Sequence, residues 1–286
     1  MPETSPFSAN WRGLTWTRWV PLDAPARAVS AIPTGAGIYR VRIVGINERL
    51  AYIGQTGRNL RERTRALGLH THRAQAPFND PHTAAPGLWV WRVEEGYAYE
   101  VSVTSTTGDK ADRLGLEDCL LWHHRVALGA STLANYGLFH PDWVRPTNKA
   151  KAVALARRAT AVPGAMASVS PLTGPSGAPE ASDWMGLPWS ASSPLTSAGA
   201  RQASAGPGVY RIVDTSGAVV YVGESGQVSK RLVQHARKSG AGAMSFAWVD
   251  LPGQADHQRH EIESDLLGAF YEGQGRPPSH QYGCWP

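Results

Sequence analysis

The chain has 286 residues, 42% of them hydrophobic, enough for two ordinary globular domains, and its net charge of +5 favours a polyanionic partner. No apolar run is long enough to span a membrane and no signal peptide is visible, so a membrane-spanning protein is excluded. The two cysteines, Cys119 and Cys284, make neither a structural zinc site by themselves nor a disulfide framework, so a reducing, cytoplasmic compartment is expected.

A tryptophan-rich stretch opens each half of the chain. Residues 11–22 carry Trp11 and Trp16 followed by a Pro-Leu pair, and residues 184–195 repeat this pattern 173 positions later. Such an internal repeat indicates a duplicated structural unit. We expect the tryptophans to pack beneath a sheet, because aromatic side chains mostly serve core packing, and residues 1–10 to form a frayed tail. The tryptophans are Trp11, Trp16, Trp184 and Trp189.

A β-hairpin follows each tryptophan stretch. Alternating, β-branched residues predict strands over 37–44 and 49–53 in the first copy, and over 209–213 and 219–222 in the second. In both copies the first strand begins with Gly-Ile-Tyr or Gly-Val-Tyr, and the second ends with Tyr-Ile-Gly or Tyr-Val-Gly. The final glycine lets the backbone turn sharply or approach a ligand.

A basic helix comes after each hairpin. The pattern predicts helices over 60–67 and 228–238, with Asn59 and Ser229 near their starts as capping residues. In the first copy two more strands are predicted, whereas the second copy offers only one. The predicted strands are 88–93, 97–104 and 243–251.

A longer, half-apolar helix is the last shared element. It is predicted over 113–128 with Glu117 inside it, and over 256–271 with Glu263 inside it. Eighteen residues after each acid comes an amide followed by Tyr-Gly, which aligns the two acids with each other. The amides are Asn135 and Gln281.

The segment between the copies has its own composition. Residues 147–159 are rich in Ala, Lys and Arg and predict a helix, and residues 162–182 predict a flexible linker of Pro, Ala, Gly and Ser. The expected domains are therefore 11–146 and 184–286, joined by 147–183.

These landmarks resemble those of the GIY-YIG nuclease superfamily, in the same order and in both copies. The resemblance implies an α+β chain with two tandem domains, each a small central antiparallel sheet of about three strands flanked by helices. Members cut DNA phosphodiesters with one divalent metal, Mg²⁺ or Mn²⁺. The matching positions are Gly37-Ile38-Tyr39, Tyr52-Ile53-Gly54, Arg63, Glu117 and Asn135, and Gly208-Val209-Tyr210, Tyr221-Val222-Gly223, Arg231, Glu263 and Gln281.

The resemblance implies a catalytic role for each residue of the first set. Glu117 is the metal ligand, Arg63 holds the scissile phosphate, and Tyr39 is the general base, which needs help because a tyrosine has a pKa of about 10. Tyr52 orients water or phosphate, and Asn135 fixes the site. The second set carries the same roles on Tyr210, Tyr221, Arg231, Glu263 as the metal ligand, and Gln281.

Every one of these residues also has a structural interpretation. The tyrosines fit core packing, the arginines a solvated helix face, the acids a helix surface and the amides a turn. Three histidines add candidates for proton transfer or phosphate contact. His235 lies one turn after Arg231, where the first copy has Leu67; His123 and His124 follow Glu117 along its helix.

Basic side chains near the two short helices are expected to contact DNA. The insert 68–112, with its histidines and with Trp89 and Trp91, is the candidate reader of the DNA. The expected contact residues are Arg58, Arg61, Arg65, His70, His72, Arg73, Lys230, Arg237 and Lys238.

The leading hypothesis is a metal-dependent endonuclease for double-stranded DNA, in which two sites act as an internal pseudo-dimer of a monomeric chain. Restriction or defence is the expected setting, with repair behind it. One alternative is a nucleic-acid binding protein with one or both sites inactive. Another is a scaffold recruited for a reaction on a small phosphate or nucleotide, which would bind substrate without the steep salt dependence of DNA binding.

Overall fold

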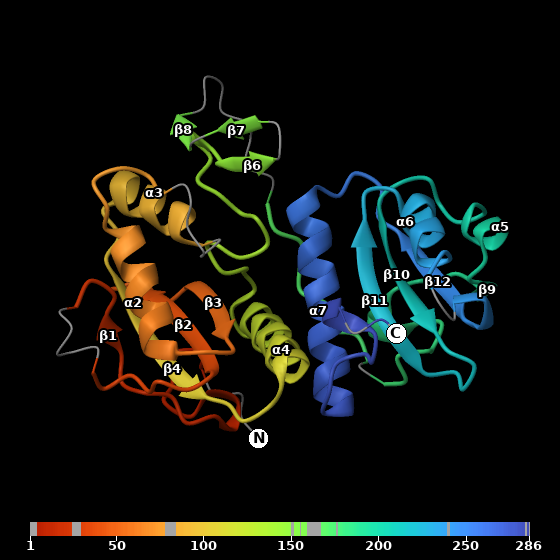
Figure 1. Ribbon diagram of the computed structural model, residues 1–286, viewed down its shortest axis with the longest axis horizontal. Coiled ribbons are helices and arrows are strands. Elements are labelled where there is room, and N and C mark those ends of the chain that lie inside the picture. Colours follow the sequence, from red (N-terminus) through yellow and green to blue (C-terminus); the bar gives the residue numbers. More distant parts are fainter. Residues whose placement is uncertain are drawn as a thin grey trace. The chain divides into compact units, whose positions relative to one another are not determined.

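The chain forms antiparallel sheets and helices of the α+β class (Figure 1). No helix among the described residues is long and apolar enough to cross a membrane. The computed structural model describes residues 5–24, 30–77, 84–149, 152–154, 156–158, 167–175, 177–238, 241–283 and 285.

The chain divides into two compact units, and one helical segment from the first half of the chain groups with the second unit. Unit 1 is Met1–Arg113 with Ala127–Ala167, and unit 2 is Leu114–Val126 with Ser168–Pro286. The expected domain boundaries, 11–146 and 184–286, differ from this division because the middle of helix α4 (Lys110–Leu128) groups with the second unit. Hydrogen bonds from Arg125 on α4 to Asp265 on the last long helix, Asp256–Gln274, account for this grouping.

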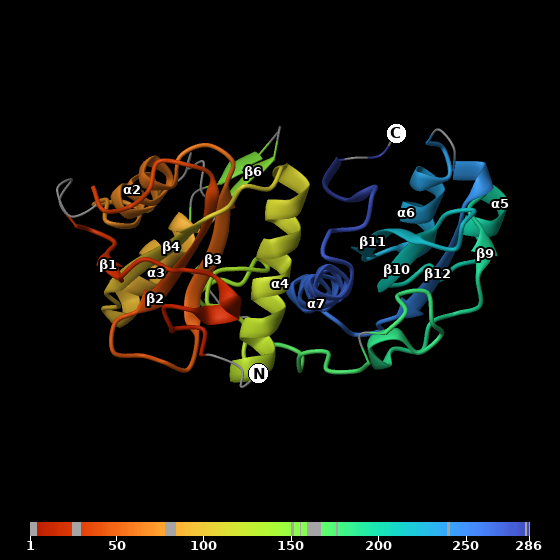
Figure 2. The ribbon, with the colours of Figure 1, turned by 90° about the horizontal axis from the view of Figure 1, so that it is seen from below.

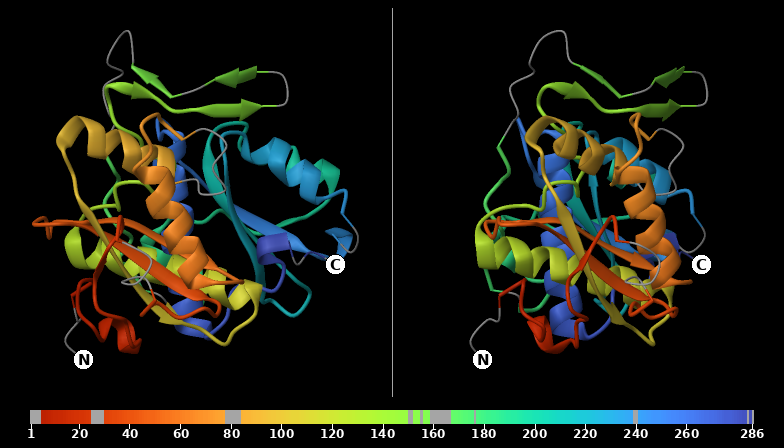
Figure 3. Two further views of the ribbon diagram at one scale, coloured as in Figure 1. Left: turned by 60° about the vertical axis from the view of Figure 1, so that its left-hand side comes forward. Right: turned by 90° about the vertical axis from the view of Figure 1, so that its left-hand side faces the viewer.

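Unit 1 contains the first hairpin in a four-stranded antiparallel sheet. The order is β1-β4-β2-β3, so the expected three strands are present with a two-residue strand added at the edge. Helices α2 and α3 pack against each other and against the sheet face that carries Tyr39 and Val41 (orange and gold in Figure 3). The elements are β1 (Val20–Pro21), β2 (Gly37–Ile43), β3 (Leu50–Thr56), β4 (Tyr99–Ser105), α2 (Leu60–Thr71) and α3 (Ala85–Glu95).

Helix α3 stands where the sequence predicted a strand over 88–93, and that prediction is wrong. Pro86 lies in the first turn of the helix, where proline is tolerated, and Gly96 ends it in the left-handed conformation. Ala84, Ala85 and Leu88 are buried at helical spacing against the sheet. A short apolar run therefore belonged to a buried helix, which periodicity alone does not distinguish from a strand.

Unit 2 repeats this topology with the strand order β11-β10-β12-β9. Helix α6 packs on one face of the sheet with Tyr210, and helix α7 packs on the opposite face with Val209 (Figure 2). The elements are β9 (Ser193–Pro194), α5 (Ser197–Ala200), β10 (Gly208–Val213), β11 (Val219–Ser225), α6 (Val228–His235), β12 (Ser245–Asp250) and α7 (Asp256–Gln274).

The helix starts differ between the two copies. Asn59 caps α2 as predicted, because its side-chain oxygen accepts a hydrogen bond from the Glu62 N–H at 3.2 Å. Gln227 occupies the N-cap position of α6 without a side-chain cap. The predicted capping role of Ser229 is therefore wrong, since Ser229 lies inside the helix.

The described part of the segment between the copies forms short strands, so the helix predicted over 147–159 is wrong. Local strand pairing outweighs the helix-forming composition there. The strands are β5 (Trp143–Val144) paired with β8 (Arg157–Arg158), and β6 (Thr147–Lys149) paired with β7 (Ala152–Ala154). Single-turn helices complete the chain: η1 (Trp11–Gly13), η2 (Trp184–Gly186), η3 (Ala241–Ala243) and η4 (Gln281–Gly283).

The two tryptophan stretches fold alike, and the expected core packing of all four tryptophans is confirmed. Trp11 and Trp16 stack with ring centroids 6.0 Å apart, and Trp184 and Trp189 stack at 5.8 Å. In each pair the second indole N–H donates to the carbonyl of the first tryptophan, at 3.2 and 3.0 Å. All four side chains are buried.

A buried arginine holds the chain that leads into each tryptophan stretch. Arg40 donates to the carbonyls of Pro6 and Ser8, so residues 5–10 are not the frayed tail that was expected; residues 1–4 lie outside the described residues. Arg211 binds the carbonyls of residues 179–181 in the same way. The described part of the expected linker is therefore packed at this point, while 162–166 and 176 lie outside the described residues.

Candidate active site

In unit 2 two phenol rings pack over a glycine. Tyr210 on β10 lies opposite Gly223 on β11, and its ring centroid is 6.0 Å from that of Tyr221. A Cβ atom at Gly223 would lie 2.6 Å from the Tyr210 hydroxyl oxygen and 2.7 Å from Cε1 of Tyr221. Glycine is needed here because any side chain would displace both phenols.

Helix α6 adds a histidine to these phenols. Nε2 of His235 lies 3.0 Å from the Tyr210 hydroxyl oxygen, and the imidazole is buried. Burial, reinforced by the charges of Lys238 and Arg231, lowers the pKa of His235 to about 3. The imidazole is therefore neutral at pH 7, and Nε2 can accept the phenol's hydrogen bond.

Arg231 lies one helical turn before His235 and acts on both phenols. Its charge and its hydrogen bonding favour their ionised forms, but burial is the largest effect and raises the pKa of both Tyr210 and Tyr221. Arg231 is itself exposed, in an open hollow of about 450 Å³ that Lys230 also lines. A cation thus faces solvent beside two phenols that stay protonated at neutral pH.

Helix α7 brings a carboxyl group to the same surroundings. Glu263 has its pKa raised to about 8, first by burial and then by the charges of Glu224 and Asp118. Its own charge raises the pKa of both phenols, which places it within electrostatic reach of Tyr210 and Tyr221. Unit 2 therefore gathers the predicted phenols, guanidinium and carboxylate around one place.

Glu224 is a second acid at this place that the sequence analysis missed. It follows Gly223 directly on β11. Its carboxylate accepts a hydrogen bond from Arg259 Nε at 2.8 Å and lies 3.3 Å from His260 Nε2. The first copy has Gln55 in the corresponding position, so comparing the residue after Tyr-Ile-Gly with the residue after Tyr-Val-Gly would have found it.

Asp118 is a third acid, and it comes from α4. Ser264 Oγ and the Tyr282 hydroxyl donate to its two carboxylate oxygens at 2.8 and 2.5 Å. Burial raises the pKa of Asp118 to about 6 although both hydrogen bonds oppose that shift. No sequence signal pointed to Asp118, because α4 belongs to the other copy along the chain.

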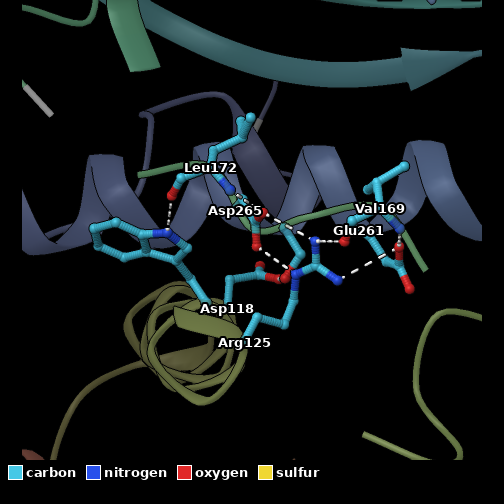
Figure 4. Close-up of polar contacts among 8 residues, drawn as sticks. Asp118, Arg125, Val169, Leu172, Glu261 and Asp265 are labelled. Carbon is cyan, nitrogen blue, oxygen red and sulfur yellow. Dashed lines mark hydrogen bonds and ion pairs between the residues drawn. The ribbon is translucent and has the colours of Figure 1, made fainter. Parts of the chain in front are cut away.

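A buried arginine holds α4 against α7 (Figure 4). Arg125 Nε donates to Asp265 Oδ1 at 2.8 Å, and its guanidinium also lies 3.4 Å from Glu261. The two acids in turn accept backbone hydrogen bonds from Val169 and Leu172, each at 2.9 Å. This network fixes Leu114–Val126 within unit 2 and so positions Asp118 near Glu263.

The side chains of the two predicted amides hydrogen-bond to the backbone of the strands that carry the tyrosine-glycine motifs. Gln281 Oε1 accepts from the Val222 N–H at 3.1 Å. Asn135 accepts from the Ile53 N–H at 3.0 Å and donates to the Ile53 carbonyl at 2.9 Å. Each amide therefore holds the middle residue of the tyrosine-glycine motif in place, as a positioning residue.

Unit 1 repeats the phenol pair but with different surroundings. Tyr39 and Tyr52 have ring centroids 5.9 Å apart, and a Cβ at Gly54 would lie within 2.7 Å of both rings. Arg63 lines an open hollow of about 420 Å³, as Arg231 does. Leu67, which is buried, takes the place of His235.

Glu117 lies in the part of α4 that groups with unit 2. Its charge raises the pKa of Tyr282, a residue of that unit. The other residues of the first predicted set, Tyr39, Tyr52, Arg63 and Asn135, belong to unit 1.

The histidines of α4 belong to another cluster. His123 is buried, and its Nε2 lies 3.4 Å from the Glu272 carboxylate. His124 is completely buried.

The predicted DNA-contacting side chains fall into two groups. Most are exposed, but Arg61 donates to the carbonyls of Ile32 and Ser30 at 2.8 and 2.7 Å and so serves the fold. His72 is also engaged, because its Nδ1 lies 2.8 Å from the Gly68 carbonyl. The exposed residues are Arg58, Arg65, Arg73, Lys230, Arg237 and Lys238, while His70 is half-buried.

The two tryptophans of the insert pack against other residues of unit 1. Trp89 is buried and donates to the Arg73 carbonyl at 2.8 Å. Trp91 stacks on Tyr97 with centroids 5.9 Å apart. Both rings thus make contacts within unit 1, and the reading of DNA by the insert 68–112 stays a prediction.

Comparisons of the chain with protein-family models, with curated proteins and with solved structures found no significant match.

Proposed function

We propose that the chain is a metal-dependent DNA endonuclease whose working site lies in unit 2. The observation that supports this most is the convergence of two phenols, an exposed guanidinium and an acidic cluster in one unit. Tyr210, Tyr221, Arg231 and Glu263 come from four separate elements, and Arg231 and Glu263 both act electrostatically on the two phenols. These groups match the set that the resemblance to GIY-YIG nucleases implies.

Arg231 is the phosphate-binding group in this proposal. It faces solvent from the hollow, together with Lys230. A guanidinium forms two parallel hydrogen bonds to a phosphate and stabilises the charge that develops during hydrolysis. Arg237 and Lys238 extend the exposed basic surface along the chain after α6.

Glu263 would hold a Mg²⁺ or Mn²⁺ ion. Glu263 would supply a hard carboxylate oxygen, the ligand type that such an ion prefers, and the ion would displace the proton that the raised pKa of about 8 leaves on this carboxyl at pH 7. Arg259 and His260 engage Glu224, which leaves Glu263 as the ligand. A bound divalent ion supplies Lewis acidity toward the phosphate.

Tyr210 and His235 form a proton relay. The phenol O–H donates to His235 Nε2, and Arg231 hydrogen-bonds to the same phenol oxygen. As water attacks phosphorus, its proton passes to the Tyr210 oxygen and the phenol's own proton passes to His235. A phosphate bound at Arg231 offsets one of the cations that lower the pKa of His235, which makes this transfer easier.

We infer a different role for unit 1, which would bind DNA and cleave it weakly or not at all. It carries Leu67 in place of the relay histidine and Gln55 in place of the second acid. Arg63 and the exposed Arg58 still line a hollow that a phosphate can occupy.

Plasmid cleavage by a Tyr210→Phe variant tests the proposal. With supercoiled DNA and Mg²⁺ or Mn²⁺, we expect nicking or linearisation by the parent chain and a loss of about 100-fold or more in the variant, because the relay oxygen is gone. Tyr97→Phe is the matched control, because the phenylalanine also loses one hydroxyl but keeps an aromatic ring against Trp91. Full activity in Tyr210→Phe, or no cleavage by the parent with either ion, contradicts the proposal.

A further inference from the structure

Three metal-ligating side chains that the proposed nuclease site does not use meet on α4 and α7, within unit 2. Cys119 Sγ lies 3.5 Å from Glu272 Oε2, and His123 Nε2 lies 3.4 Å from the same oxygen. One ligand atom from each residue lies within 4.8 Å of the other two. Cys119 and His123 are buried, while the Glu272 side chain is 42% exposed.

The two helices hold this arrangement before any ligand binds. Cys119 and His123 are four residues apart on α4, so they project from the same side of the helix. Glu272 lies in the last turn of α7. The Arg125–Asp265 ion pair fixes α4 against α7 two residues further along α4, so the three ligands need no folding event to meet.

The distances of the Glu272 oxygen from the other two ligand atoms fit one tetrahedral ion. Zinc binds Cys sulfur at about 2.3 Å, His nitrogen at about 2.0–2.1 Å and carboxylate oxygen at about 2.0–2.2 Å. The edges of a tetrahedron with such bonds measure roughly 3.3–3.6 Å. The observed S–O and N–O distances of 3.5 and 3.4 Å fall in that range.

We propose that Cys119, His123 and Glu272 bind Zn²⁺. A thiolate, an imidazole and a carboxylate together favour zinc over the magnesium that suits an all-oxygen site. The exposed side of Glu272 opens the fourth position to water. The ion cross-links α4 to α7, the two helices that position Asp118 and Glu263. This inference stands without the proposed nuclease activity.

Cobalt, which substitutes for zinc, gives the direct test on the full chain. Titration of Co²⁺ into the reduced protein is expected to produce a thiolate-to-cobalt absorption band that saturates at one equivalent, because the thiolate is a ligand. A Cys284→Ser variant, which changes the other cysteine, keeps the band. A Cys119→Ser variant loses it. Absence of the band from the Cys284→Ser protein overturns the proposal.

Thermal stability in the presence of Zn²⁺ gives a second readout, which does not need an absorption band. At a hundredfold excess over its Kd, Zn²⁺ is expected to raise Tm by about 5–10 °C in the Cys284→Ser protein. His123→Ala and Glu272→Gln are expected to reduce the rise and to weaken zinc binding about tenfold or more.

Alkylation of Cys119 covers the case in which Cys119→Ser does not fold. Bound zinc slows the modification of Cys119 in the folded Cys284→Ser protein, which mass spectrometry of the peptide detects. An alkylation rate that zinc does not change, or a rise in Tm that Cys119→Ser leaves intact, contradicts the site.

Discussion

The two units carry the same pair of phenols over a glycine but surround it with different groups. In unit 2 the pair meets His235, with Glu224 beside Glu263; unit 1 has Leu67 and Gln55 in the corresponding positions. The shared part is a packing requirement, because either glycine would clash with both rings if it carried a Cβ. The two units therefore differ at two polar positions around the same phenol pair, and the proposed function assigns their different roles to these positions.

The two units also share a backbone conformation in the segment that follows each long helix. Tyr136 and Tyr282 both adopt left-handed φ values, +58° and +55°, which are uncommon for an aromatic residue. Each follows an amide that binds the middle of the tyrosine-glycine strand. The amide and the strained tyrosine therefore belong to the fold of the repeat, and their presence in unit 1 does not argue for catalysis there.

Arginine replacement is expected to separate the two units most strongly. Arg231→Ala should lower plasmid cleavage about 10²–10³-fold, since it removes the group that stabilises the phosphate in the transition state. Arg63→Ala should lower it less than about tenfold, through DNA affinity. Single-turnover cleavage at saturating protein measures the first effect free of the second. Equal losses of cleavage in both variants would contradict a working site in unit 2 alone.

Alanine at the two glycines is expected to show what the units share. Gly54→Ala and Gly223→Ala should each destabilise the chain by about 2 kcal/mol, because the new Cβ would lie within 2.7 Å of phenol atoms in both units. Urea unfolding followed by tryptophan fluorescence measures this. A loss at one glycine and none at the other would show that the rings pack differently from one unit to the other.

Replacing His235 by the leucine of unit 1 is expected to give a smaller, pH-dependent effect. The folded pKa of about 3 lies below the ordinary value of 6.5, so the unfolded chain binds the extra proton and stability falls as pH drops below 6.5. Between pH 7.5 and 5.5 this costs the parent about 1 kcal/mol, and His235→Leu should lose that dependence. Urea titrations at the two pH values test it, and an unchanged pH dependence in the variant would contradict a buried neutral imidazole.

Local patterns predicted the repeated elements well. Alternation and turn residues located β2, β3, β10 and β11, and the half-apolar helices α4 and α7 followed from spacing. The strand predicted over 88–93 and the helix over 147–159 were wrong, because short apolar or helix-forming stretches take their structure from what they pack against.

The candidate site was predictable only where its residues share a local motif. Tyr210, Tyr221 and Arg231 follow one another closely along the chain, and the spacing to Gln281 aligned Glu263. Asp118 was not predictable, because it reaches unit 2 through the contact of Arg125 with Asp265, which lies 140 residues away in sequence. Such a contact depends on packing between distant segments, which periodicity does not report.

Cleavage of supercoiled plasmid by Glu263→Gln and Glu117→Gln, side by side, tests the central claim most directly. Asp250→Asn, an exposed acid at the end of β12, controls for the loss of one negative charge. With Mg²⁺ or Mn²⁺ we expect Glu263→Gln to lose about 100-fold or more of the parent's cleavage, while Glu117→Gln stays within about tenfold and Asp250→Asn matches the parent. Cleavage retained by Glu263→Gln, or lost equally in Glu117→Gln, would contradict a single working site in unit 2.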